Sequence, residues 1–166
     1  MMPRMTALPV GMRLSHPVAF IATWFGSGLM PKAPGTWGTL AAMPFAYLIT
    51  LCIGQDALLP AAFVAFALGT WAAGAYAVAS GKPDPSEVVI DEVAAIWLVL
   101  ALVPFTFVGW ALAFAAFRLF DVVKPWPVSL ADAKLKGGFG IMFDDIVAAI
   151  YAMLTLHFLF YLAEVF

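Results

Sequence analysis

The sequence predicts an all-α fold: a multi-pass membrane helical bundle with about five spans, forming a single domain over residues 1–166. Hydrophobic residues make up 64% of the chain and charged residues 11%, and the mean hydropathy is +1.00. A soluble domain contains about 45–50% apolar residues. The composition therefore indicates a protein embedded in a lipid bilayer, and the bilayer is its first expected partner.

Five apolar segments, separated by polar or helix-breaking residues, are the expected spans. In chain order they cover residues 40–53, 58–79, 88–103, 105–120 and 146–163. A helix needs about 20 residues to cross the hydrocarbon core, so the shorter segments must borrow flanking residues or be buried against neighbours. Gly54 and Pro104 mark tight connections, because both residue types interrupt helices. Residues 1–25 are expected to form a cytoplasmic or interfacial segment.

The distribution of positive charge predicts the topology. All eight Lys and Arg residues fall before the first span, between the second and third, or around the connection of the fourth and fifth: Arg4, Arg13, Lys32, Lys82, Arg118, Lys124, Lys134 and Lys136. Short loops rich in Lys and Arg stay in the cytoplasm. We therefore expect the N-terminus inside and the C-terminus outside. Most acidic residues follow the same connections, which predicts a polar site at the cytoplasmic membrane face.

One candidate part of this site is the stretch GSGLMPKAPGTWGTL, residues 26–40. Backbone N–H groups in such a Gly- and Pro-rich loop, beside Lys32 and Thr36 and before a helix, suit a phosphate anion. The stretch lacks the G-K-[ST] ending of a P-loop, so no nucleotide is predicted. The alternative is an ordinary helix start with Thr39 as the N-cap.

Five carboxylates form the second candidate part. The expected helix ends bring them together: Asp91, Glu92, Asp121, Asp144 and Asp145. These groups would repel one another unless a cation lies among them, and Mg²⁺ prefers oxygen ligands that include carboxylates and substrate phosphate. We therefore expect a magnesium site. For Asp91 and Glu92 the alternative is that they stabilise a helix start at the headgroup level.

The third part is FRLFDVVKPWP, residues 117–127, in which Arg118, Asp121 and Lys124 are spaced by three. On a helix Arg118 and Asp121 share a face, and Pro125 should end that helix at the preceding residue. Arg118 and Lys124 are candidates for binding phosphate oxygens. The alternative is an ion pair beside a lysine that extends to the membrane surface.

Charge at the headgroup level favours metal-assisted chemistry on a lipid phosphate. The net charge of -2 does not indicate a nucleic-acid partner. A small membrane transporter or cation-binding protein is the rival, although a transport site should lie near the bilayer midplane. Another metal-dependent headgroup enzyme, a phosphatidyltransferase, would be expected to carry a D-G…A-R…G…D…D signature, which does not occur.

Together these stretches resemble the phosphatidylglycerophosphatase A family. The resemblance covers residues 25 to about 149 and rests on four motifs in family order: GSGLMPKAPGTWGTLAAMPFAYL, the DE of VVIDEVAAIW, FRLFDVVKPWP and GGFGIMFDDIVA. It implies a Mg²⁺-dependent phosphatase of the cell inner membrane. Such an enzyme converts phosphatidylglycerophosphate to phosphatidylglycerol and inorganic phosphate, with its active site facing the cytoplasm.

The resemblance also implies roles for individual residues. The motif positions carry over to catalytic Asp121, Asp144 and Asp145, to phosphate-binding Lys32, Thr36, Arg118 and Lys124, and to metal-binding Asp91, Glu92, Asp121, Asp144 and Asp145. Pro34 and Gly35 also fall on motif positions. Direct hydrolysis by water and a phospho-aspartate intermediate on Asp121 or Asp144 both remain open.

Overall fold

The computed structural model describes residues 8–126 and 135–165, and the regular structure within these ranges is helical. The all-α prediction is therefore confirmed for the described part of the chain. The helices are α1 (Pro17–Ala22), α2 (Pro34–Cys52), α3 (Leu58–Ser80), α4 (Ile90–Leu100), α5 (Phe107–Val123) and α7 (Gly137–Val165), with short 3-10 turns η1 (Ser27–Leu29) and η2 (Gln55–Ala57).

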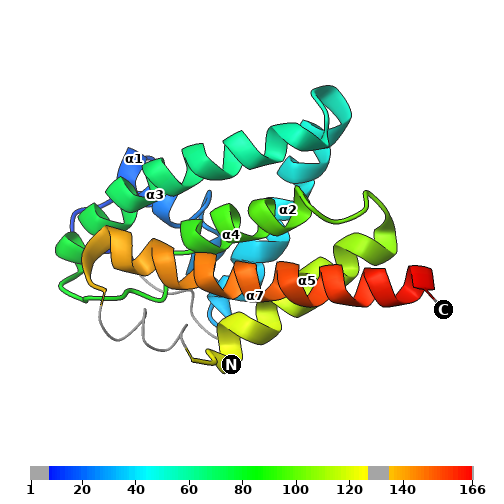
Figure 1. The fold of residues 1–166 in the computed structure, drawn as a ribbon. Coiled ribbons are helices and arrows are strands. Elements are labelled where there is room, and N and C mark those ends of the chain that lie inside the picture. Colours follow the sequence, from blue (N-terminus) through cyan, green and yellow to red (C-terminus); the bar gives the residue numbers. More distant parts are fainter. Residues whose placement is uncertain (1–7, 127–134, 166) are drawn as a thin grey trace.

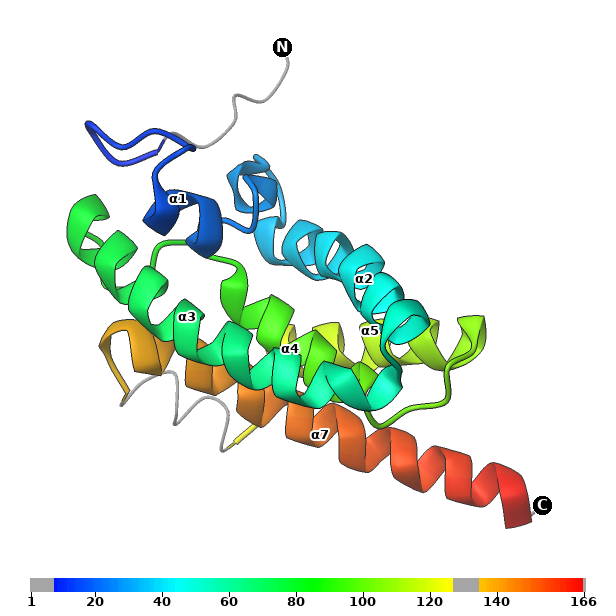
Figure 2. The same cartoon turned by 90° about the horizontal axis from the view of Figure 1, so that it is seen from above.

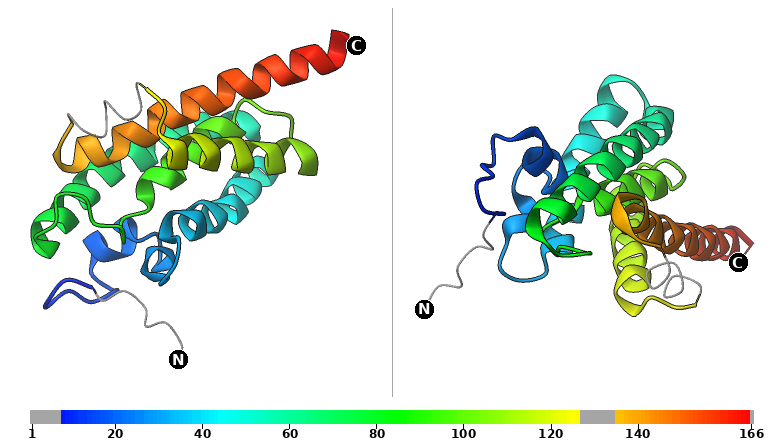
Figure 3. Two further views of the ribbon diagram at one scale, coloured as in Figure 1. Left: turned by 90° about the horizontal axis from the view of Figure 1, so that it is seen from below. Right: turned by 90° about the vertical axis from the view of Figure 1, so that its left-hand side faces the viewer.

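The five longer helices pack side by side and alternate in direction (Figures 1 and 2). Helices α2, α4 and α7 begin at the end of the bundle where α3 and α5 finish, which we call the polar end (Figure 3). Helix α4 is the central element and contacts α2, α3, α5 and α7. Nearly all its side chains are buried, because a helix that is apolar on every side must be covered by neighbours.

Within the described residues, three helical segments are long and apolar enough to cross a membrane: Pro34–Cys52, Gln55–Ser80 and Gly137–Ala163. Helix α4 has 11 residues, so it is about 16 Å long at 1.5 Å per residue, roughly half of the ~30 Å bilayer core. Helix α5 has 17 residues. The predicted segments 88–103 and 105–120 are thus largely helical, but the count of about five spans is not confirmed.

The first membrane helix begins earlier than predicted. The expected start was residue 40, whereas α2 begins at Pro34. Proline suits the first helical position because its N–H would be unpaired there in any case. The alternative N-cap role for Thr39 is therefore wrong: Thr39 is buried inside α2, and its hydroxyl donates a hydrogen bond to the Gly35 carbonyl oxygen at 2.8 Å.

The last helix also begins early, at Gly137 rather than at residue 146. Gly138 lies inside α7 at its crossing with α3. A Cβ atom at Gly138 would overlap the Thr70 carbonyl oxygen and lie 2.8 Å from the Gly74 nitrogen. The absent side chain lets the two backbones approach closely, as small residues do in membrane helix pairs. Asp144 and Asp145 therefore do not open a helix; they lie about 11–12 Å along α7 from its start.

At the end of the bundle opposite the polar end, Gln55 holds the last residues of α4 in place. Gln55 Nε2 donates hydrogen bonds to the carbonyl oxygens of Leu100 at 2.7 Å and Val103 at 2.6 Å. These are carbonyls that the end of a helix leaves without an intrahelical partner. In the middle of the bundle, Trp97 Nε1 donates to the Ala42 carbonyl oxygen at 3.0 Å. Helix α4 is thus tied both to α2 and to the connection between α2 and α3.

Positive charge gathers at the polar end. In the described ranges, every Lys or Arg lies before α1, before α2, after α3, at the end of α5 or before α7: Arg13, Lys32, Lys82, Arg118, Lys124 and Lys136. Arg4 and Lys134 lie outside the described residues. The predicted clustering of charge at one end is therefore found among the described residues.

Candidate functional site

A cavity of about 560 Å³ lies at the polar end, between the starts of α2, α4 and α7 and the end of α5. The charged residues of three predicted stretches line it together: Asp91, Glu92, Arg118, Asp121, Lys124, Asp144 and Asp145. The stretches are far apart in the sequence, and the alternating direction of the helices brings their polar ends together. The predicted convergence on one site is thus found in the fold.

Three carboxylates form the most compact part of the cavity, which we call the acidic cluster: Asp91, Glu92 and Asp145. One oxygen from each lies within 4.8 Å of the other two. Glu92 and Asp145 are buried, and Glu92 Oε2 and Asp145 Oδ2 have no hydrogen-bond partner within the described part of the chain. Such orphaned buried oxygens are costly unless a ligand satisfies them.

Asp91 lies in the first turn of α4, where it adds a third carboxylate to the acidic cluster. Its Oδ1 accepts a hydrogen bond from the Glu92 backbone N–H at 3.0 Å. Burial, and then the charge of Glu92, raise the pKa of Asp91 well above its ordinary value. Burial and the neighbouring carboxylate thus disfavour the charged form of Asp91, in spite of the favourable dipole at the helix start.

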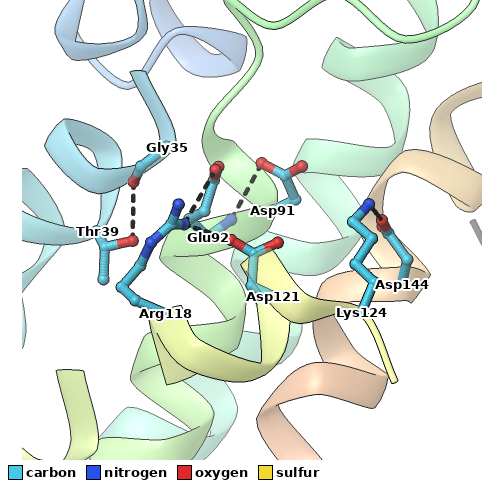
Figure 4. A network of polar contacts seen from close by, with 8 residues as sticks. All are labelled: Gly35, Thr39, Asp91, Glu92, Arg118, Asp121, Lys124 and Asp144. Atoms are coloured by element: carbon cyan, nitrogen blue, oxygen red, sulfur yellow. Dashed lines mark hydrogen bonds and ion pairs between the residues drawn. The ribbon is translucent and has the colours of Figure 1, made fainter. Parts of the chain in front are cut away.

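Two cationic side chains from the end of α5 face the acids (Figure 4). Arg118 Nη1 lies 2.6 Å from Asp121 Oδ2 and 3.6 Å from Glu92 Oε1. Lys124 Nζ lies 2.7 Å from Asp144 Oδ2. The ion pair suggested as an alternative for this stretch is present, and it lies inside the cavity, where Arg118 and Lys124 can also meet a bound anion.

The way in which α5 ends explains the direction of the Lys124 side chain. The helix ends at Val123, one residue before Lys124, which confirms that Pro125 stops it. Lys124 adopts a left-handed conformation with φ 45°, a common way for a helix to terminate. The main chain leaves the helix at Lys124. The Lys124 side chain extends toward α7, where it contacts Asp144 (Figure 4).

Two predicted phosphate ligands lie outside the cavity wall. Lys32 is exposed in the loop before α2, and Thr36 is partly buried in the first turn of that helix. Neither lines the cavity, whereas Ala33, Pro34 and Gly35 do. The same stretch therefore reaches the site, but it does so through Ala33, Pro34 and Gly35.

Gly35 has a role that the residue spacing did not reveal. A Cβ atom there would overlap Glu92 Oε1 and lie 3.0 Å from Arg118 Nη1. Only glycine lets the first turn of α2 approach this carboxylate so closely. Asp84 and Lys136, which the motifs did not single out as site residues, also line the cavity. Their charge, and for Asp84 its place shortly before the predicted span 88–103, were the available signals.

The acidic cluster fits a hard divalent cation. Its donors are all carboxylate oxygens, two of them lack partners, and they come from two helices, α4 and α7, that the bundle holds together. Mg²⁺ takes this kind of ligand and usually keeps positions for water and phosphate. Asp121 and Asp144 lie outside the acidic cluster, and each makes a close ion pair with a cation of α5, at 2.6 and 2.7 Å, whereas Glu92 lies farther from Arg118, at 3.6 Å.

Comparison with known proteins identifies a family. Residues 20–160 match the protein-family model described as Phosphatidylglycerophosphatase A. A protein of that name from Haemophilus influenzae is 40% identical over 143 residues, covering 86% of this chain and 88% of the relative. The Escherichia coli protein of that name is 38% identical over 149 residues, covering 89% and 86%.

A third relative carries a different name. A Bacteroides thetaiotaomicron protein with the provisional name phosphatidylinositol-3-phosphatase is 39% identical over 145 residues, covering 82% of this chain and 89% of the relative. No solved structure matches the chain.

Proposed function

The chain belongs to the phosphatidylglycerophosphatase A family and is a phosphatidylglycerophosphatase, and we propose that its active site is the acidic cluster together with Arg118 and Lys124. The reaction removes the terminal phosphate of phosphatidylglycerophosphate and leaves phosphatidylglycerol. One observation carries the site assignment: three carboxylates converge beside two cationic side chains in a cavity at one end of an apolar bundle. This arrangement suits a phosphate monoester attached to a membrane lipid.

We assign the residues of the cavity to two tasks. Asp91, Glu92 and Asp145 would hold Mg²⁺, which when bound polarises phosphate oxygens and lowers the pKa of water. Arg118 and Lys124 would neutralise charge on the transferring phosphate. Asp121 and Asp144 hold these two cations in place through the ion pairs described above. Lys32 and Thr36 remain proposed phosphate contacts for the approach to the cavity, with Lys32 attracting the anion from outside.

Direct hydrolysis is the route that the ion pairs favour. A phospho-aspartate route would use Asp121 or Asp144 as the nucleophile, yet each already has a cation within 2.7 Å. A carboxylate neutralised in this way is a weaker nucleophile than a free one. In direct hydrolysis water attacks phosphorus, the bond to the glycerol oxygen breaks, and that oxygen leaves as the lipid hydroxyl after taking up a proton.

We expect acid quenching during turnover to trap no phosphorylated protein. The experiment uses substrate labelled with ³²P in the terminal phosphate, and the protein is separated under acidic conditions that preserve an acyl phosphate. The control is the same protein quenched before substrate is added. Labelled protein that forms and decays at the rate of turnover would instead establish the phospho-aspartate route.

The orientation that we propose places the polar end at the cytoplasmic face of the inner membrane. The positively charged segments of the described chain all lie at that end, and such segments are retained in the cytoplasm. The alternating direction of α2, α3, α4, α5 and α7 supports five passes, in which flanking residues complete the short α4 and α5. The first turn of α4 then lies outside the hydrocarbon core.

Removal of divalent metal tests the chemistry. We expect the purified protein in detergent micelles to release phosphate from phosphatidylglycerophosphate when Mg²⁺ is present. Excess chelator should reduce release to background, and added Mg²⁺ should restore it, because the acidic cluster repels a phosphate without a bridging cation. Phosphatidylinositol 3-phosphate, tested in parallel, measures selectivity. Full activity in chelator would contradict the metal assignment, and no release under any condition would contradict the site as a phosphatase.

A further inference from the structure

A second cavity, of about 550 Å³, runs along the outside of the bundle between α2 and α5, and we call it the α2–α5 groove. Its long walls are apolar apart from the Tyr47 hydroxyl and the Trp110 N–H. The residues that line these walls are Leu40, Met43 and Tyr47 of α2 and Trp110, Ala111 and Phe114 of α5. Since α2 is a candidate membrane span, the groove faces the depth at which acyl chains lie.

The helical faces that form the groove continue into the active-site cavity. On α5, residues 111, 114, 118 and 121 follow at spacings of three and four, so the groove residues share a face with Arg118 and Asp121. On α2, residues 47, 43, 40 and 36 follow the same rule and lead to Thr36. Thr36 thus lies between the groove and the cavity, although it lines neither.

The distance from Arg118 in the cavity to the far end of the groove matches one acyl chain. Arg118 and Phe107, which lines the far part of the groove, are separated by 11 residues of α5. This corresponds to about 16 Å, and one leaflet contributes about half of the ~30 Å hydrocarbon core.

Three aromatic rings pack against one another at the far end: Tyr47, Phe105 and Trp110, with centroids 5.3–6.4 Å apart. These rings close the far end of the groove to an acyl chain that enters from the cavity.

A further apolar groove of the described bundle does not lead to the site. It has about 300 Å³ and lies between α3 and α7, lined by Phe66, Phe139 and Phe143 among others. On α7, Phe139 precedes Gly140 and Phe143 precedes Asp144, and both of these following residues line the active-site cavity. Adjacent helical residues point about 100° apart, so the two phenylalanines face away from the cavity wall. Along α3 the way toward the polar end is blocked, because Gly69 packs against the Met142 side chain.

We propose that the α2–α5 groove binds an acyl chain of the lipid substrate while the phosphate occupies the cavity. This inference rests on the proposed function, since it identifies the lipid part of that substrate. The lipid enters sideways from the bilayer between α2 and α5, with its phosphate directed at Arg118. The groove then selects for long-chain lipids over soluble phosphate esters, because contacts remote from the reacting bond help to position it.

A bulky residue in the groove should separate long-chain from short-chain substrates. We expect Ala111→Trp to lower kcat/KM for dioleoyl phosphatidylglycerophosphate about tenfold, because a displaced chain holds the phosphate out of position. The water-soluble dihexanoyl substrate should be hydrolysed within twofold of the wild-type rate. The matched control is Ala67→Trp, at an exposed α3 residue that lines neither groove, and it should leave both rates unchanged. Equal losses on both substrates, or no loss on either, would overturn the groove assignment.

A labelling experiment tests the groove without turnover. A non-hydrolysable phosphonate analogue of the lipid substrate, with a diazirine near the end of one acyl chain, is irradiated with the wild-type protein in the presence of Mg²⁺, and the modified peptides are mapped. We expect label on residues 40–47 and 105–114. Label spread evenly over exposed α3 and α7 residues such as Phe63 and Leu154 would contradict the proposal. If the wild type released no phosphate from either substrate, the proposed function would fail, and the position of the label would still decide whether the groove binds lipid.

Discussion

Replacing Asp145 with asparagine is expected to lower kcat for phosphate release by the order of 10³-fold, the upper part of the range for losing one electrostatic contact at a reacting centre. Asp145 supplies one of three converging carboxylates, and its Oδ2 is buried without a partner in the described structure. Asparagine keeps the shape but removes the charge that would hold a divalent cation. Phosphate release in mixed micelles at saturating Mg²⁺ measures the effect.

The thermal midpoint of the same variant distinguishes a lost ligand from a damaged fold. Removing one charge from a group of neighbouring acids relieves repulsion and desolvation, so Asp145→Asn should unfold at the same temperature as the wild type or higher. The control is Asp56→Asn, at an exposed acid at the opposite end of the bundle, which should change neither property. Wild-type turnover by Asp145→Asn would remove Asp145 from the active site.

Gly138→Ala is expected to have the largest effect on stability, a loss of about 1–3 kcal/mol, the usual cost of forcing an extra group into a packed interior. The new Cβ would overlap the Thr70 carbonyl oxygen, and a backbone atom in α3 cannot rotate away as a side chain can. The gain of about 1 kcal/mol in helix propensity from glycine to alanine is not enough to offset the overlap. A thermal midpoint of Gly138→Ala below that of the wild type, measured in detergent, would show this loss of stability.

Gly74→Ala on the facing helix is the matched comparison. Its Cβ would lie 3.3 and 3.4 Å from the nitrogen and Cα of Gly138, a tight contact without an overlap. The gain in helix propensity and the cost of the tight contact then nearly cancel. The thermal midpoint of Gly74→Ala should therefore stay close to that of the wild type. If both variants unfold at the wild-type temperature, α3 and α7 do not cross as closely as described.

Local patterns in the sequence predicted the parts of the site that depend on one helix. The pairing of Arg118 with Asp121 follows from a spacing of three, and the end of α5 follows from Pro125, so both expectations are met in the structure. The meeting of three stretches at one end was also predictable, because antiparallel helices return the chain to the same end of a bundle.

Features that depend on contacts between helices could not be read from the sequence. Gly138 and Gly140 look like loop residues, since glycine disfavours helix by about 1 kcal/mol, and only the approach to α3 explains why α7 includes Gly138. Lys32 and Thr36 belong to the right stretch, but the first turn of α2 brings Gly35 to the acids instead. The division of five acids into a cluster and two ion pairs likewise depends on which helices face each other.

The short central helix has a consequence for the surrounding membrane. Helix α4 is about 16 Å long, and Gln55 holds its far end. The start of α4, which carries Asp91 and Glu92, therefore does not reach the level at which α3 ends (Figure 1). A lipid phosphate that meets the acids there must lie deeper than the end of α3, at the inner edge of the headgroup region. A thinner bilayer reduces that depth, and mismatch costs fractions of a kcal/mol per Å. Because one short, buried helix sets the depth of these acids, we expect the rate of phosphate release to depend on bilayer thickness.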